Sequence, residues 1–156
     1  MQPQARSFQL ELTDELFIQA PLEFVWNVTV DVESWPRWTP TVKSVKILSQ
    51  GEFGLGSRAL LKQPMQAEAE WIVSKFQPLR LFEWVSRRSG IYLTARHEIL
   101  QTEKGTISKL TLLAEGFLIR LLWPVLKNRL AQSIKTENLG LKKYCETANI
   151  HLSSSA

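Results

Sequence analysis

The sequence predicts an α+β domain in which a curved antiparallel sheet wraps around one long C-terminal helix. Three observations support this fold class. Two short helix-like segments follow the first strand-like segment, six further strand-like segments come without another helix, and a long helical period starts only at Phe117. A sheet of this kind encloses space between itself and the helix. The sequence therefore predicts a cavity, and a cavity indicates a ligand.

The N-terminal part is expected to form one strand and two short helices. Apolar and polar residues alternate over residues 7–19, which is typical of a half-buried strand, and the polar run 13–15 indicates a bend or bulge at its centre. Pro21 fits the first turn of a helix, where no amide hydrogen is needed. Asp31 is expected to cap the second helix, which the following prolines limit to about two turns.

Six further strands are expected in the middle of the chain. Short links such as Ser89-Gly90 and residues 103–105 are typical of hairpin turns, so these strands should form an antiparallel meander. The glycine-rich segment 51–56 neither follows a buried strand nor opens a helix, and we interpret it as a hairpin turn rather than a phosphate loop. The expected strands cover residues 42–48, 58–63, 68–76, 81–88, 91–101 and 106–114.

The C-terminal segment predicts a long amphipathic helix. Its apolar residues follow a spacing of three to four, whereas its basic residues fall off that stripe. Pro124 is expected in a first turn or at a kink near the start, and residues 151–156 are expected to be a frayed tail. The stripe consists of Leu118, Leu122, Leu126, Leu130, Ile134, Leu141 and Cys145.

The net charge of +4 and the pI near 9.4 describe a mild basic excess. Because the basic residues are spread, without a run of like charges, a solvated surface is the first interpretation and an anionic partner, such as a membrane face or a nucleic acid, is the second. No nucleic-acid-binding module is visible, so we expect no nucleic-acid partner, while transient membrane contact stays open. Either a monomer or a homodimer is compatible with the sequence.

Cys145 is the single cysteine, so no disulfide can form within the chain, which suits a reducing compartment. Its apolar position on the expected helix indicates a buried structural thiol. Residues 1–10 lack the apolar region of a signal peptide, and the most apolar run, 117–126, is interrupted by Arg120 and too short to span a bilayer. We therefore expect a cytoplasmic protein.

Several signals of cofactor and metal chemistry are missing from the sequence. His97, His151 and Cys145 do not make a zinc set, and neither a Walker loop nor a Rossmann fingerprint is present. The Gly-x-Ser-x-Gly elbow of a hydrolase is also missing, although a Ser-His-Asp triad is not excluded by counting residues. We expect no metal and no cofactor.

Strand parity predicts which side chains face the cavity, because successive side chains point to opposite faces of a sheet. In residues 81–88 we take the face of Phe82 and Trp84 as inward, since Glu83 marks the other face. Large tryptophans beside small Ala and Ser residues would leave a void, which the helix would close with Leu118, Leu122, Leu126 and Ile134. The predicted ligand-binding residues are Trp71, Phe82, Trp84, Leu93, His97, Leu110, Leu112, Leu122 and Leu126.

His97 is the sharpest candidate, because parity places it on an apolar face. A buried imidazole must find a partner, since an unpaired buried polar group costs roughly 1–3 kcal/mol. Three roles are open for it: a core histidine satisfied by a neighbour or a water, a contact to a ligand carbonyl, or a general acid or base. Trp35 and Trp38 are expected to fill the space between the short helices and the sheet rather than to stack on a ligand.

Three segments carry a resemblance to a known family: Ala20-Pro21-Leu22-Glu23-Phe24-Val25-Trp26, then residues 34–42 with the pattern Trp-Pro-x-Trp-x-Pro, and Gly54-Leu55-Gly56-Ser57-Arg58. With the order of elements, over residues 8–148, the chain resembles the START-like, or SRPBCC, superfamily, in particular its polyketide cyclase/dehydrase-like bacterial members. The resemblance implies one domain over residues 1–156 with a helix-grip fold, in which a seven-stranded antiparallel sheet curls around the C-terminal helix and a hydrophobic tunnel lies between them.

The resemblance does not imply one activity, because the superfamily includes lipid-transfer proteins, polyketide aromatases and cyclases, plant hormone receptors and coenzyme Q-binding proteins. The first hypothesis is a binding, and possibly transport, protein for a hydrophobic small molecule or lipid, without turnover. The second is a cyclase or dehydratase that uses His97 in the same cavity. The third is an interaction module without a small ligand, which would use residues 117–126 as a dimer or membrane surface.

Overall fold

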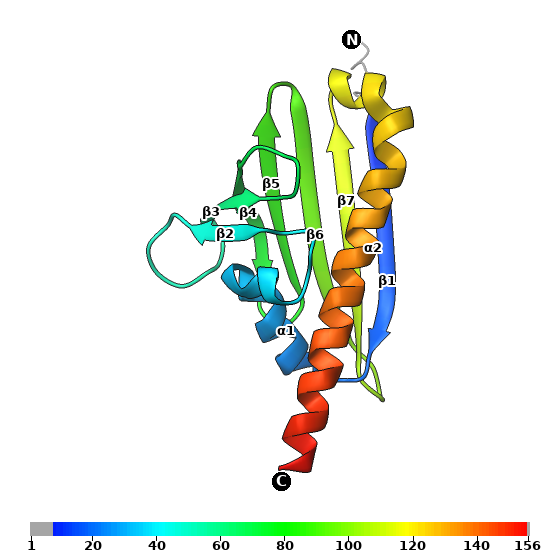
Figure 1. Ribbon diagram of the computed structural model, residues 1–156. Coiled ribbons are helices and arrows are strands. Elements are labelled where there is room, and N and C mark those ends of the chain that lie inside the picture. Colours follow the sequence, from blue (N-terminus) through cyan, green and yellow to red (C-terminus); the bar gives the residue numbers. More distant parts are fainter. Residues whose placement is uncertain (1–7, 156) are drawn as a thin grey trace, which may run out of the picture.

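The structure is a computed structural model that describes residues 8–155, and it consists of one antiparallel sheet with a long helix along its face (Figure 1). The strands follow the order β1-β7-β6-β5-β4-β3-β2, so only the pairing of β1 with β7 joins strands distant in sequence. The elements are β1 (Gln9–Ile18), α1 (Leu22–Val30), the 3-10 helix η1 (Val32–Arg37), β2 (Ser44–Ile47), β3 (Arg58–Lys62), β4 (Ala69–Gln77), β5 (Leu81–Arg88), β6 (Ile91–Gln101), β7 (Thr106–Glu115) and α2 (Phe117–Ser154).

This architecture confirms the predicted α+β class with a seven-stranded antiparallel sheet, two short helices and a long C-terminal helix. The alternation of apolar and polar residues explains it, because the inner faces of the strands, which carry residues such as Trp71, Val73, Trp84 and Ile99, are buried beneath the helices. The helices α1 and η1 lie at one end of the sheet, and the last turns of α2, drawn in red, extend beyond it (Figure 1).

The first strand differs from its expectation, because β1 has no bend or bulge at residues 13–15. Its register with β7 runs without a shift from Gln9 opposite Glu115 to Ile18 opposite Thr106. Asp14, which interrupts the apolar inner face, keeps its place because the Asn138 side chain of α2 donates a hydrogen bond of 2.8 Å to its carboxylate. A charged residue at an inner position was thus the sign of a polar contact with the helix.

The irregularity lies in β4 instead, where the register with β5 shifts between Val73 and Lys75. On the outer face at this point, Glu83 is buried. Arg96 and Lys75 cover its carboxylate at 2.7 and 3.5 Å, and the Arg96 and Ser74 hydrogen bonds hold the pKa of Glu83 below its ordinary value although burial opposes this. The choice of Phe82 and Trp84 as the inward face still holds.

The short helices fill the space at one end of the sheet. The indole of Trp35 donates a hydrogen bond of 3.1 Å to the carbonyl oxygen of Thr29 and packs edge-on against Trp84, with ring centroids 5.3 Å apart. Asp31 stands at the N-cap position of η1, but among the described residues its side chain makes no capping hydrogen bond, so the expected cap is wrong. Packing of Val32 and Trp35 into the core holds this helix instead.

The long helix α2 begins after Gly116 and continues to Ser154. Gly116 has a φ of 120°, and a Cβ there would collide with the carbonyl oxygen of Gly90, so only glycine suits this position. Pro124 lies inside the helix, and the first turns, drawn in yellow, lie off the axis of the rest (Figure 1). Residues 151–154 are helical, which corrects the expected frayed tail. Within residues 8–155 no helix is long and apolar enough to cross a membrane.

The C-terminal half of α2 packs closely against the sheet and α1. Ile134, Leu141 and Cys145 are buried there, and Gly140 lies so close to the residue that follows η1 that a Cβ would collide with the carbonyl oxygen of Trp38. In the preceding half, residues 117–130, only Ile119 is buried. The helix therefore closes against the sheet at one end and leaves a cavity at the other.

Candidate functional site

A cavity of about 850 Å³ lies between the inner face of the sheet and the first half of α2. A volume of this size is at the upper end of what small-molecule sites occupy. Its wall is mostly apolar on both sides. The sheet and η1 contribute Trp35, Leu61, Trp71, Trp84, Ile91, Leu93, Ala95, Leu110 and Leu112, and α2 contributes Ile119, Leu122, Leu126, Leu130 and Ile134.

Eight of the nine predicted ligand-binding residues line the cavity, although ligand binding by them stays a prediction. The ones that line the cavity are Trp71, Trp84, Leu93, His97, Leu110, Leu112, Leu122 and Leu126. Phe82 differs, because it is fully buried and its ring stacks on the imidazole of His97, with centroids 4.5 Å apart and an angle of 13°. Ile119 takes the place expected for Leu118, because it lies three residues before Leu122 and so faces the same side of the helix.

His97 lies at the inner end of the cavity and is buried on three sides by aromatic rings. Besides Phe82, the rings of Trp35 and Trp84 lie with their centroids 5.2 and 6.3 Å from the imidazole. Burial in this apolar setting disfavours the charged imidazolium and lowers the pKa of His97 to about 3. The imidazole is therefore neutral near pH 7 and can accept or donate one hydrogen bond.

Glu137 of α2 is the functional candidate that the sequence analysis missed. Its carboxyl oxygen Oε1 lies 3.9 Å from Nδ1 of His97, whose side chain is buried, while that of Glu137 is 13% exposed. Burial raises the pKa of Glu137 to about 8, although a hydrogen bond from the Thr41 hydroxyl partly opposes this. Both groups are thus mainly neutral near pH 7, and their contact is not a salt bridge. At 3.9 Å it is also too long for a direct hydrogen bond, so both groups retain capacity for an oxygen-bearing ligand.

A signal for Glu137 was present in the helical spacing. The apolar stripe of α2 has a gap between Ile134 and Leu141, and Glu137 and Asn138 fill that gap on the same face. Both point inward: Asn138 to the backbone and side chain of Asp14, and Glu137 to the cavity. Polar residues inside an apolar helical stripe therefore marked the inner end of the site.

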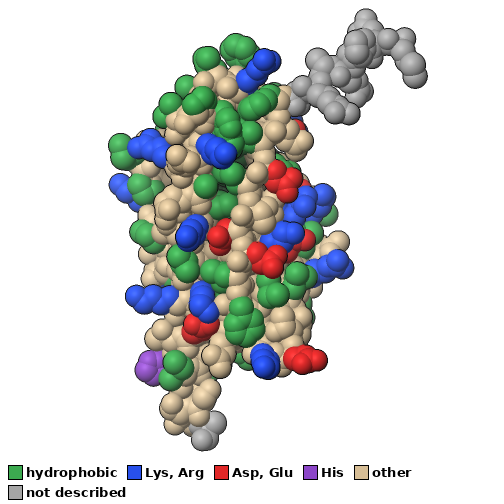
Figure 2. All heavy atoms as spheres, turned by 90° about the vertical axis from the view of Figure 1, so that its right-hand side faces the viewer, with side chains coloured by type: hydrophobic (Ala, Val, Ile, Leu, Met, Phe, Trp, Pro, Cys, Tyr) green, Lys and Arg blue, Asp and Glu red, His purple; other side chains and the backbone are tan. Residues whose placement is uncertain are grey.

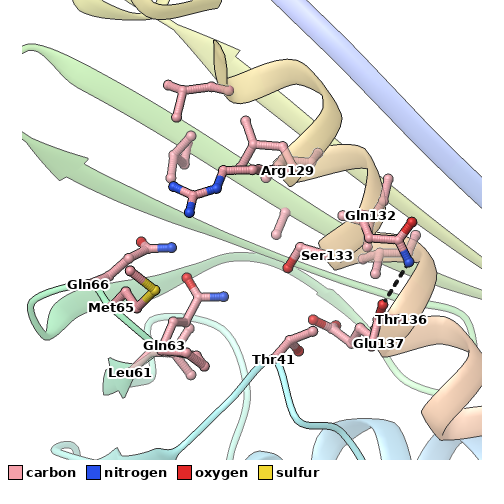
Figure 3. A pocket seen from close by; sticks show the side chains of 18 of the residues that line it. Thr41, Leu61, Gln63, Met65, Gln66, Arg129, Gln132, Ser133, Thr136 and Glu137 are labelled. Atoms are coloured by element: carbon pink, nitrogen blue, oxygen red, sulfur yellow. Dashed lines mark hydrogen bonds between the residues drawn. The ribbon is translucent and has the colours of Figure 1, made fainter.

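The outer part of the cavity is more polar. Figure 3 shows Gln63 and Gln66, from the loop between β3 and β4, facing Arg129 and Ser133 of α2 across the open space. Met65 stands between the two glutamines on the same loop. These residues had no periodic signal, because a loop has no repeating face and only the fold brings it opposite the helix.

Trp35 has two roles, because it fills the space beside the short helices, as expected, and also lines the cavity. Trp38 is partly buried in the same region. The indole nitrogens of Trp38 and Trp71 have no hydrogen-bond partner among residues 8–155. Trp71 also lines the cavity, so an unpaired donor lies in its wall.

Comparison with known proteins matches this chain to one protein family and to a curated relative from a bacterium. The family described as polyketide cyclase/dehydrase and lipid transport matches residues 9–146. A protein of Streptomyces halstedii, named "Putative polyketide cyclase", is 35% identical over 75 residues, which cover 48% of this chain and 58% of the relative. The match thus covers less than two thirds of that relative's length.

Solved structures with a similar fold share little sequence with this chain. The di-domain ARO/CYC StfQ from the steffimycin biosynthetic pathway has a TM-score of 0.76 and 11% identity, over 92% of this chain and 53% of that one. A point mutant of norcoclaurine synthase from Thalictrum flavum, in complex with a transition-state analogue, has a TM-score of 0.67 and 13% identity, over 90% and 99%. Ara h 8.0201 has a TM-score of 0.66 and 12% identity, over 90% and 99%. At these identities the likeness shows the fold alone.

Proposed function

We propose that this chain, which belongs to the polyketide cyclase/dehydrase and lipid transport family, binds a hydrophobic small molecule or lipid in the cavity under α2. The observation that carries the proposal is the cavity itself, about 850 Å³ in volume with mostly apolar walls. The proposal includes action in the cytoplasm, for which the single cysteine, buried Cys145, is the supporting observation.

The free energy of binding would come mainly from the apolar body of the ligand. Removing about 300 Å² of apolar surface from water would contribute roughly 7 kcal/mol at about 25 cal/mol per Å². Lost translational and rotational freedom offsets part of that gain. Trp71, Trp84 and Leu112 would supply much of the contact area on the sheet side.

The polar groups of the cavity select the ends of the ligand. At the inner end, His97 and Glu137 are neutral and mostly shielded from solvent, so a hydroxyl or carbonyl oxygen can bond to them without bringing a charge. A carboxylate there would lie beside a second carboxyl group and lose its hydration. At the outer end the Arg129 side chain reaches over the cavity (Figure 3) and suits an anionic or oxygen-rich group.

The first experiment is native mass spectrometry of the protein purified from its own host, followed by denaturing extraction of any bound small molecule. A reproducible hydrophobic adduct is the expected result. The second is titration with the neutral fluorescent probe N-phenyl-1-naphthylamine, which brightens in an apolar site. We expect the probe to bind the wild-type chain and to be displaced by the extracted compound.

A cavity-filling variant tests whether the probe binds in the proposed place. Ser133 faces the cavity from α2, so Ser133→Trp should fill part of it and weaken probe binding at least about tenfold, or roughly 1.4 kcal/mol. Lys135→Trp, on the exposed side of the same helix, is the matched control and should leave binding unchanged. Equal probe binding by Ser133→Trp would contradict the cavity as the binding site.

A second candidate function is an enzyme that moves protons on a ligand in the same cavity, and the His97–Glu137 pair is the observation that favours it. Neutral His97 can accept a proton, and neutral Glu137 can donate one, within the same apolar site. A product formed from the extracted compound by the wild type, but not by His97→Gln or Glu137→Gln, would support catalysis. Equal product formation by these variants would exclude the pair from it.

A further inference from the structure

The beginning of α2 carries three large apolar side chains that the cavity does not use. Phe117, Leu121 and Val125 follow each other at intervals of four residues and are 76%, 64% and 69% exposed. None of them lines the cavity, whose wall takes the neighbouring Leu122 and Leu126 instead. An apolar row of this kind, rather than scattered single residues, is typical of a surface that meets a partner. We call these three residues the apolar ridge.

The charged residues within the first part of α2 are all basic. Residues 116–136 contain four basic residues and no acidic one, while the carboxyl groups of Glu115 and Glu137 bracket the segment. Hydrophobic and basic side chains gather at this end of the molecule (Figure 2). Within residues 8–155 none of the four forms an ion pair, although Lys127 lies over the ring of Trp123 at 5.8 Å. The four are Arg120, Lys127, Arg129 and Lys135.

The apolar ridge lies beside the mouth of the cavity. Leu122 and Leu126 alternate with the ridge residues along the same turns of α2, and they face the cavity. Across the opening, the loop between β3 and β4 presents Met65, which lines the cavity and is 91% exposed. A surface that covered the ridge would thus also meet the opening through which a ligand passes.

We propose that the first part of α2 docks onto an anionic membrane surface, with the apolar ridge inserted at the headgroup boundary and the basic residues against the lipid phosphates. Amphipathic helical segments with apolar and basic residues bind bilayers in this way. The mixture of exposed apolar and purely basic side chains favours this occupant over a second copy of the chain, because two copies would bring their own positive charges together. In the docked state a hydrophobic ligand could pass between the bilayer and the cavity, and this role rests on the proposed function.

Vesicle flotation with the full chain tests the proposal. Vesicles of phosphatidylglycerol and phosphatidylcholine in equal parts should carry the wild-type protein, and vesicles of phosphatidylcholine alone should not. The double variant Leu121→Ser, Val125→Ser should lower the partition coefficient at least about tenfold. The matched control is Ile150→Ser, Leu152→Ser, at the other end of α2, where the side chains are 64% and 62% exposed, and it should bind as the wild type does.

A second double variant tests the contribution of the basic residues to membrane docking. The double variant Arg120→Gln, Lys127→Gln should lower the partition coefficient onto the anionic vesicles about fivefold for each charge removed. Added salt should lower the partition coefficient of the wild type more than that of this variant, because salt screens the charges that the variant lacks. Equal partition of the wild type onto both kinds of vesicle, or an equal loss in the Ile150 and Leu152 control, would overturn the proposal.

Two further readouts separate the alternatives. Light scattering of the wild type should give the monomer mass; a dimer that Leu121→Ser, Val125→Ser dissociates would overturn the proposal in favour of a second copy. The apolar and the charge double variants of the first part of α2 should still bind N-phenyl-1-naphthylamine in solution, because their substituted residues do not line the cavity. Loss of vesicle binding with retained probe binding therefore supports membrane docking, whereas probe binding by itself tests only the proposed function.

Discussion

The two halves of α2 have the same secondary structure and opposite environments. In residues 117–130 the helix presents large apolar side chains to solvent and lines a cavity, with Ile119 as its only buried residue. In residues 134–145 it buries Ile134, Asn138, Leu141 and Cys145 against the rest of the protein. The second half stabilises the fold, and this allows the first half to stand away from the sheet and leave room for a ligand.

Polar residues follow the same division. Asn138 is buried, and its amide nitrogen donates to Asp14 and to the carbonyl oxygen of Ser108. Glu137, its neighbour, faces the cavity and has no comparable partner beyond Thr41 and His97 among the described residues. A one-residue step along the helix thus separates a group that holds the structure from a group that is available to a ligand.

The largest expected effect compares one leucine in each half. Leu141→Ala removes a buried side chain and should lower the free energy of unfolding by about 3 kcal/mol, because it leaves a cavity against the sheet. Leu121→Ala removes an exposed one and should change stability by less than about 0.5 kcal/mol. Urea unfolding of both variants measures the difference. Equal destabilisation would mean that the two halves contribute alike.

The second comparison concerns the buried amide. Asn138→Ala leaves the Asp14 carboxylate without its 2.8 Å partner and should cost about 2 kcal/mol of stability. Asn128→Ala, in the first half of the helix, alters an exposed amide and should have an effect below about 0.5 kcal/mol. Thermal unfolding with both variants checks this, and a stable Asn138→Ala protein would show that the hydrogen bond to Asp14 is dispensable.

The last comparison concerns the pH dependence of stability caused by the His97–Glu137 pair. Burial lowers the pKa of His97 from 6.5 to about 3, so the unfolded chain binds more protons there between these pH values and stability rises with pH. Burial raises the pKa of Glu137 from 4.5 to about 8, so the folded chain holds more protons there and stability falls as pH rises. The two effects oppose each other between pH 4.5 and 6.5, and above 6.5 only that of Glu137 acts.

Stability should therefore decline from pH 6.5 to pH 8 by on the order of 2 kcal/mol. Glu137→Gln removes the titrating group and should abolish this decline. His97→Gln should keep this decline, but it should lose the fall in stability that protonation of His97 causes as the pH drops. Urea unfolding from about pH 3 to about pH 8 measures both variants. The same decline above pH 6.5 in wild type and Glu137→Gln would show that the carboxyl group does not carry the raised pKa.

Much of the fold followed from local patterns. The strands at 81–88 and 91–101 were predicted with the bounds that the structure has, because clear alternation and tight turns define them. The expected bulge at residues 13–15 was wrong, since Asp14 keeps the alternation through a contact with a helix residue 124 positions away. The expected Asp31 cap was wrong because core packing, rather than a cap, holds the short helix.

The sequence by itself determined which side chains share a face, because the periods of strand and helix follow from covalent geometry and need only neighbouring residues. It therefore placed His97 among the residues that line the cavity. The tertiary structure alone decided that Glu137 lies 3.9 Å from His97, that the loop with Gln63 and Gln66 faces Arg129, and which half of α2 is covered. Distance, burial and pKa depend on how segments far apart in the chain pack together, and no local period contains that information.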